Sequence, residues 1–404
     1  MVPPTIRLAR EVRAAAWLAA LAGGGCGRSA TLPEPEPAAS ADQCVLPTGD
    51  PGAPRELVVA AVRPEDSAVV ARRRPEPFIR LDCLGIARPG IAESWTPDST
   101  HRAWTFVLAP SALGLTAAAT ATEWRSSPDA ATTLRYAGVA SLLPLDTRRL
   151  VVTLDQPTDS VPTLFADPSL GLVTDSLPSS GTTFVLRRPA SGDPRDALDA
   201  GADILRTGDP AILEYARARS DYVVHPLPWS RTYALIIPPG RDEFRALISG
   251  DSAEFRAGLA RDAVRTEARG AEPPFWWEKA GPCPIPPAGS TPRGVTGNAV
   301  VYASEDTVAR ALAGRVVALS ERPMTATSSL PARLMAGALR DGSALAYVVA
   351  VPRTALVPCR EIAAWPERAT VIPLIDTRMS VIVRRGVPRL TVELDGSLRP
   401  AEAP

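Results

Sequence analysis

The residues of this chain with the most reactive side chains are two histidines and five cysteines. A Ser/His/Asp triad would have to use His101 or His225, and both stand beside turn-forming residues. The sequence contains no GxSxG elbow, Walker A loop, HExxH motif or complete GxGxxG followed by a helix. We therefore predict no enzyme, no cofactor and no metal site, and keep a hydrolase as an alternative.

One cysteine, Cys26, follows a segment with the layout of a secretory signal peptide. Three arginines precede the apolar run from 14 to 22, and three glycines then lead into Cys26. About nine apolar residues are too few to span a bilayer of roughly 30 Å as a helix. Small residues before a cysteine resemble a bacterial lipobox, in which the thiol is lipidated. We predict that residues 1–26 direct export and that Cys26 anchors the chain to a membrane; the alternative is ordinary secretion, with Cys26 discarded.

The other four cysteines, Cys44, Cys83, Cys283 and Cys359, form no CxxC pair, so a structural zinc site is not expected. An even number of cysteines in an exported chain predicts disulfides, and four cysteines permit three connectivities. We favour Cys283 with Cys359, because they flank one segment and could clip its two ends. Cys44 with Cys83 is the natural complement.

Charge and composition exclude some classes of partner. The 404 residues carry 44 basic and 44 acidic side chains, which gives no electrostatic footprint for nucleic acid or an anionic membrane surface. With 45% hydrophobic residues, the chain is long enough for two or three lobes, each with its own core.

A hairpin is the best-defined element of the first half of the chain. Residues 96–102 are rich in turn formers, and Trp104, Phe106 and Leu108 alternate with less apolar residues. Residues 27–55, which are rich in Pro and Gly, predict a disordered tether.

Strands and helices alternate in the second half. The helical period of residues 252–269 predicts a helix, and residues 270–293 predict a long loop. Beyond residue 298 the pattern predicts a βαβ arrangement with parallel strands and right-handed crossovers. The expected strands are 299–303, 324–327 and 344–351, and the expected helices are 307–319 and 331–339.

Several motifs resemble family 5 extracytoplasmic solute-binding proteins, the peptide, nickel and oligosaccharide receptors of ABC importers. Residues 78–95, followed by 103–108, resemble the family's "pL..ld..G...PgLAesW" and "WtFxLR". Residues 197–205 resemble "aL.sGevDi", residues 256–265 resemble "vRqAlayAiDR", and residues 371–386 resemble the closing "iPLy" segment. These motifs occur in the same order along the chain as in the family, although the family's usual Gly-Pro and Phe-Asn pairs are missing.

The resemblance implies an α/β fold of the two-lobed periplasmic-binding-protein type II, with mixed sheets, flanking helices and a hinge. Lobe I would span 56–237 and include the hairpin subdomain, lobe II would span 238–365, and 366–404 would return to lobe I. The implied function is an exported, monomeric solute-binding lipoprotein that serves an ABC importer permease at the periplasmic or extracellular face. Its ligand would be a small polar solute, with an oligopeptide favoured. The alternative is a degenerate binding-protein fold that acts as an envelope interaction module.

The resemblance also implies a ligand between the two lobes, in a pocket of aromatic and a few polar side chains. The segment 352–359 contains no carboxylate, although peptide receptors of the family hold the ligand's amino terminus with an aspartate there. For each aromatic candidate the alternative role is packing, because Trp and Tyr bury ~150–250 Å² wherever they lie. The candidates for ligand binding are Trp229, Arg231, Tyr233, Trp276, Trp277 and Trp365.

Overall fold

The computed structural model describes most of the chain beyond residue 43. The described residues are 44–46, 56–61, 76–110, 114–173, 183–189, 192–241, 253–264, 266–280, 283, 297–319 and 326–400. They all belong to the unit Ser40–Pro404, which is separate from the unit Met1–Ala39. The predicted signal peptide, Cys26 and most of the predicted tether lie outside the described residues. In the part of the chain that is described, no helix has the length and apolar character needed to cross a membrane.

The predicted hairpin is the centre of a subdomain with its own core. β5 and β6 pair antiparallel, and Asp98 Oδ1 accepts the backbone N–H groups of Arg102 and Ala103 in the turn. Trp104, Phe106 and Leu108 are buried, as their alternation predicts. The sheet has the order β5-β6-β8-β7 and packs on its helices through one face. The elements of the subdomain are β3 (Ile79–Leu81), β4 (Ala87–Pro89), β5 (Ala92–Pro97), β6 (Ala103–Leu108), α2 (Ala117–Ser126), α3 (Pro128–Tyr136), β7 (Val139–Pro144), β8 (Arg149–Leu154), α4 (Val161–Leu164) and η2 (Pro168–Leu170).

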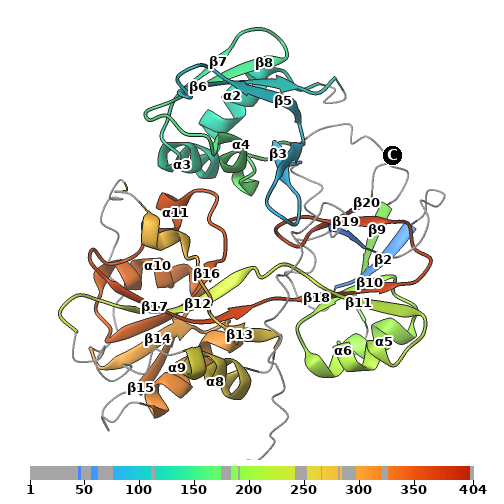
Figure 1. Ribbon diagram of the computed structural model, residues 1–404, viewed down its shortest axis with the longest axis vertical. Coiled ribbons are helices and arrows are strands. Elements are labelled where there is room, and N and C mark those ends of the chain that lie inside the picture. The colour runs from blue at the N-terminus through green and yellow to red at the C-terminus, as the bar shows by residue number, and fades with distance from the viewer. Residues whose placement is uncertain are drawn as a thin grey trace, which may run out of the picture. The chain divides into compact units, whose positions relative to one another are not determined.

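Lobe I is built on a five-stranded mixed sheet with the order β11-β18-β10-β2-β9. Helices α5 and α6 cover one face and a three-stranded sheet, β1-β19-β20, packs on the other (Figure 1). Gly201 follows α5 with a φ of +78°, the left-handed conformation that glycine commonly adopts just after a helix. The elements are β1 (Val45–Leu46), β2 (Glu56–Ala60), β9 (Thr183–Arg187), α5 (Pro194–Asp199), β10 (Ile204–Thr207), α6 (Pro210–Arg217), β11 (Tyr222–Pro226), β18 (Ser380–Arg384), β19 (Leu390–Val392) and β20 (Leu398–Pro400).

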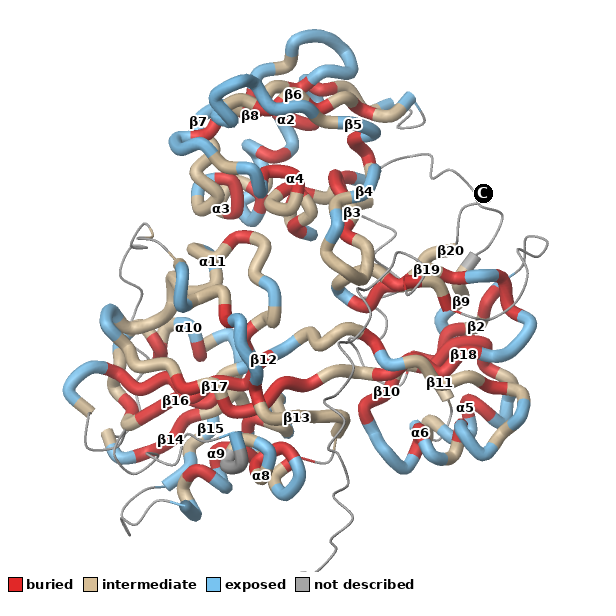
Figure 2. The backbone as a smooth tube through the Cα atoms, viewed as in Figure 1, coloured by how far each residue is buried: buried red, intermediate tan, exposed pale blue. Residues whose placement is uncertain are grey.

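Lobe II is built on a six-stranded sheet with the order β13-β17-β12-β16-β14-β15. Helices α8 and α9 cover one face and α10 covers the other, so the central strands are buried on both sides (Figure 2). β14 pairs parallel with β15 and with β16, which confirms the predicted βαβ arrangement. The elements are β12 (Arg231–Ile237), α8 (Ala253–Ala263), β13 (Ala268–Gly270), η3 (Trp276–Lys279), β14 (Ala299–Ala303), α9 (Thr307–Ala318), β15 (Ala326–Leu330), α10 (Ala332–Asp341), β16 (Ala346–Pro352), α11 (Pro358–Ile362) and β17 (Thr370–Thr377).

The structure corrects the predicted lobe boundaries. β12 and β17 are central strands of the lobe II sheet, so the chain passes between the lobes at 227–230 and 378–379 rather than after 237 and near 366. The composition of an apolar strand does not indicate which sheet it joins. The sequence therefore could not assign β12 and β17 to lobe II. The predicted tether is also too long at its C-terminal end, because Val45 and Leu46 form β1 and pair with β19.

Candidate functional site

Four aromatic side chains of lobe II lie together and form what we call the aromatic cluster: Phe275, Trp276, Trp277 and Trp365. The ring centroids of Trp276 and Trp277 are 6.1 and 6.2 Å from that of Trp365. Phe275 stacks on Trp277 with centroids 4.8 Å apart. Phe275 is buried, whereas the three indoles are only partly buried. The structure therefore brings together three of the six predicted ligand residues. It also adds Phe275, which the sequence could have indicated because it is next to Trp276 in the chain.

Local contacts hold the aromatic cluster in place. The indole N–H of Trp276 donates to the carbonyl oxygen of Pro352, at the end of β16, over 3.0 Å. A disulfide joins Cys283, beyond η3, to Cys359 in α11. Trp365 follows α11, and its backbone N–H donates to the carbonyl oxygen of Ile362. The rings are thus contributed by two segments that a covalent bond connects.

A buried ion-pair network lies next to the aromatic cluster. The guanidinium of Arg353 is 5.1 Å from the ring centroid of Phe275 and 3.5 Å from Asp376 Oδ1. Asp376 is fully buried, accepts the Thr232 hydroxyl at 2.7 Å and lies 3.3 Å from Arg269 Nε. Two arginines, the Thr232 hydroxyl and the backbone N–H of Glu272 therefore surround this carboxylate, no part of which is exposed.

Tyr233 and Arg231 lie outside the aromatic cluster, on the opposite face of the lobe II sheet from Trp365. Tyr233 is 3% exposed, and its hydroxyl donates to the carboxylate of Asp306 that caps α9. Burial raises the pKa of Tyr233, and the Asp306 carboxylate raises it further. Alternate residues of β12 point to opposite faces of the sheet, and Tyr233 points toward α8 and α9, whereas Trp365 packs on the opposite face. Arg231 shares the face of Tyr233 by the same alternation and is exposed.

Trp229 also lies away from the aromatic cluster, in the segment that leads from lobe I into lobe II. Its ring is 4.6 Å from the guanidinium carbon of Arg269 and 4.4 Å from that of Arg378. The prediction that Trp229 is near the crossover is correct, but the contacts given by the structure are with protein cations.

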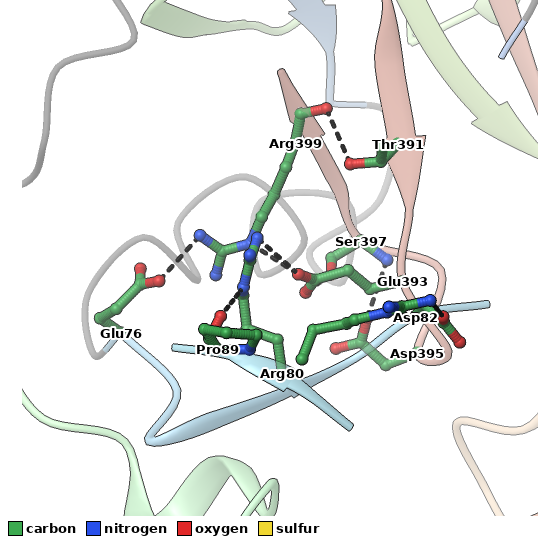
Figure 3. Close-up of polar contacts among 10 residues, drawn as sticks. Glu76, Arg80, Asp82, Pro89, Thr391, Glu393, Asp395, Ser397 and Arg399 are labelled. Atoms are coloured by element: carbon green, nitrogen blue, oxygen red, sulfur yellow. Dashed lines mark hydrogen bonds and ion pairs between the residues drawn. The ribbon is translucent and has the colours of Figure 1, made fainter. Parts of the chain in front are cut away.

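Lobe I has a pocket of about 230 Å³ beside the disulfide between Cys44 and Cys83. Figure 3 shows charged side chains in and beside this pocket that point toward one another, and they form a network of ion pairs. Arg399 donates to Glu393 at 2.7 Å and to Glu76 at 2.8 Å. Burial raises the pKa of Glu393, and Arg399 opposes this effect. The charges compensate one another, so we assign this network to holding β19 and β20 against β3 and β4. The pocket is lined by Cys44, Arg80, Asp82, Arg88, Thr391, Val392, Glu393 and Pro400.

Both disulfides that the sequence favours are present in the structure. Across the described ranges, no group of three or more His, Cys, Asp or Glu side chains is arranged to hold a metal ion.

No family profile matches the chain, and no curated protein matches it in sequence. Solved structures of binding proteins nevertheless match its fold. NikA from Brucella suis, in complex with Fe(III)-EDTA, has a TM-score of 0.58 and 12% identity, over 86% of this chain and 100% of that one. The murein tripeptide binding protein MppA of Escherichia coli has a TM-score of 0.54 and 12% identity, over 86% and 99%. OppA from Haemophilus influenzae, in complex with the peptide RPPGFSPFR, has a TM-score of 0.53 and 12% identity, over 82% and 94%.

The chain therefore has the two-lobed fold of the periplasmic solute-binding proteins, which confirms the fold that its motifs imply. These three neighbours are binding proteins rather than enzymes.

Proposed function

We propose that the chain is an exported, divergent family 5 solute-binding protein that captures a small solute or an oligopeptide for the permease of an ABC importer. The aromatic cluster is the observation that carries this proposal. Its partly buried indoles are fixed on lobe II, in a fold whose solved neighbours are periplasmic binding proteins. Rings that are held in place before a ligand arrives lose little conformational freedom on binding.

On this proposal the aromatic cluster contacts an apolar or ring-bearing part of the solute. A free amine is harder to accommodate, because Asp376 is already paired with Arg269 and Arg353 and the segment 352–359 has no carboxylate. Burying an unpaired ammonium group is strongly unfavourable. Neither Asp376 nor the segment 352–359 therefore offers a carboxylate for the amino terminus of a peptide.

A thermal-shift screen of peptides, sugars, amino acids and organic acids, combined with native mass spectrometry of the purified protein, tests this proposal. Trp277→Ala and Trp365→Ala should each weaken binding of the identified solute by ~1–3 kcal/mol, through loss of buried ring surface. Trp95→Ala, at a half-buried tryptophan of the hairpin subdomain, is the matched control and should leave affinity unchanged. If no solute copurifies and none raises the melting temperature, transport is abandoned in favour of an envelope interaction module.

We also propose that the protein lies at the periplasmic or extracellular face, anchored through a lipid on Cys26. The apolar run and the glycines before Cys26 support this. Cys26→Ala, expressed in a bacterial host, should move the protein from the membrane fraction to the soluble exported fraction. Wild-type protein found in the soluble fraction would contradict the anchor without affecting the solute-binding proposal.

A further inference from the structure

The chain crosses between lobe I and lobe II twice, from β11 to β12 and from β17 to β18, and the two crossings are bonded to each other. The amide of Leu227 donates to the carbonyl of Met379 at 2.9 Å, and the amide of Ser230 donates to that of Thr377 at 3.2 Å. Lobe motion in a two-lobed fold requires φ and ψ changes in a few such residues. Contacts that fix these segments therefore affect how easily the lobes move.

Trp229, in the first crossing, lies against two guanidinium groups. Its ring centroid is 4.6 Å from Cζ of Arg269 and 4.4 Å from Cζ of Arg378. Arg378 belongs to the second crossing, whereas Arg269 lies in β13 of lobe II. Cations over an indole are attracted by the ring's quadrupole. The stack therefore joins both crossings to a strand of lobe II.

Carboxylates of lobe II hold each of these arginines. Arg269 Nε is 3.3 Å from Asp376 Oδ2, and Arg378 Nε donates to Glu267 Oε1 at 2.8 Å. The second oxygen of Glu267, Oε2, accepts the hydroxyl of Ser380 at 2.7 Å. Ser380 is the first residue of β18 in lobe I. Glu267 thus contacts the second crossing and the strand beyond it.

We propose that Trp229, Glu267, Arg269 and Arg378 form a hinge clamp, a set of positioning residues that holds the two crossings in one backbone conformation. Rotation at the crossings has to separate or slide the indole against the guanidinium groups, so the strength of the clamp sets how readily the lobes close. The hinge clamp gives Trp229 a role in the hinge in place of the predicted ligand contact. This inference deepens the proposed function, but its test needs no solute.

Hydrogen exchange, measured by mass spectrometry on peptides that span the crossings, tests the role of the indole. Trp229→Ala should speed exchange at the amides of Leu227 and Ser230 by roughly tenfold, because the cation contacts that restrict local opening are lost. Exchange at Leu235, inside β12, should not change. Trp229→Phe keeps a ring face and should restore most of the protection.

Glu267→Gln tests the carboxylate separately. It removes the charge that holds Arg378, so exchange at the amide of Arg378, which donates to the carbonyl of Glu267, should also accelerate. Trp95→Ala is the control for the loss of a half-buried tryptophan elsewhere and should leave both crossings unchanged. Unchanged exchange at the crossings in the Trp229 and Glu267 variants, or equal acceleration throughout both lobes, would overturn the hinge clamp. Either outcome leaves the solute-binding proposal standing.

Discussion

Glu393 is a largely buried carboxyl group whose ionisation links the stability of lobe I to pH. Burial raises its pKa above the ordinary value of 4.5, and the Arg399 guanidinium and the Ser397 hydroxyl offset only part of that effect. The folded chain therefore holds this proton more tightly than the unfolded chain does. The contribution of Glu393 to the free energy of unfolding is largest at pH values below the pKa that it has in the unfolded chain. This contribution is lost as pH rises through the pKa that it has in the folded chain.

Glu393→Gln removes this titratable group, so the direction in which stability changes with pH can be predicted. The free energy of unfolding of the variant, relative to the wild type, should increase as pH rises from about 4.5 toward neutrality. Urea unfolding at a series of pH values measures the difference. Glu214→Gln, at an exposed position of α6, is the control for the loss of a carboxyl group elsewhere in lobe I. A difference that is flat or falls with pH would mean that Glu393 ionises at least as easily in the folded chain as in the unfolded one.

At the same scale, the sequence could identify aromatic residues but not the face on which each one lies. Trp276, Trp277 and Trp365 lie together. Tyr233 looked equivalent, yet the pleat of β12 turns it toward α9, and this depends on which helices cover which face. Trp229 was placed correctly near the crossover, but its arginine partners are 40 and 149 residues away in the chain and no local pattern reveals them.

The disulfide between Cys283 and Cys359 connects the two segments that supply the aromatic cluster, so its loss should affect lobe II above all. The chain-entropy model gives about 4 to 5 kcal/mol for a loop of 76 residues, and measured values are usually lower. We predict that Cys283→Ser with Cys359→Ser destabilises lobe II by ~2–4 kcal/mol. Hydrogen exchange in β16 and β17 is the measurement.

Cys44→Ser with Cys83→Ser is the matched control, because this disulfide closes a loop in the first part of the chain and should lower protection in lobe I instead. Thiol counting on denatured, unreduced wild-type protein must precede both experiments. Four free thiols, with Cys26 excluded, would show that neither disulfide forms.

At the level of elements, long segments with a clear period could be predicted, whereas strands of two or three residues could not. The alternation beyond residue 298 gave the βαβ arrangement because each strand and helix there carries its own period. The helix predicted over 252–269 ends at Ala263, and Ala268–Gly270 form β13 instead. Three residues are too few to show a period, and this strand exists because it pairs with β17. β1 was missed for the same reason, since two residues pair with β19 near the other end of the chain.

For the whole molecule, the motifs specified the fold but not where the chain passes between lobes. β12 and β17 were assigned to lobe I because the family's order of motifs was followed, whereas their pairing places both in the lobe II sheet. Pairing between strands far apart in sequence is the information that a single sequence lacks. The two short crossings that result make hinge closure the natural motion of the fold.

Closure gives the last prediction, which concerns solution behaviour of the intact protein. A solute favours the closed form only if it binds that form more tightly than the open form, and therefore only if it contacts both lobes. We predict that the cognate solute lowers the radius of gyration in small-angle scattering until the site is saturated, and that it raises the melting temperature progressively as the solute concentration exceeds its Kd. Trp277→Ala should shift both titrations to higher concentration by the same factor, because it weakens one set of contacts in the closed form. Trp229→Ala should instead change the radius of gyration before any solute is added, since the hinge clamp restrains the crossings in the free protein. A solute that raises the melting temperature with no compaction would bind one lobe alone, and the closure mechanism would then be wrong for this chain.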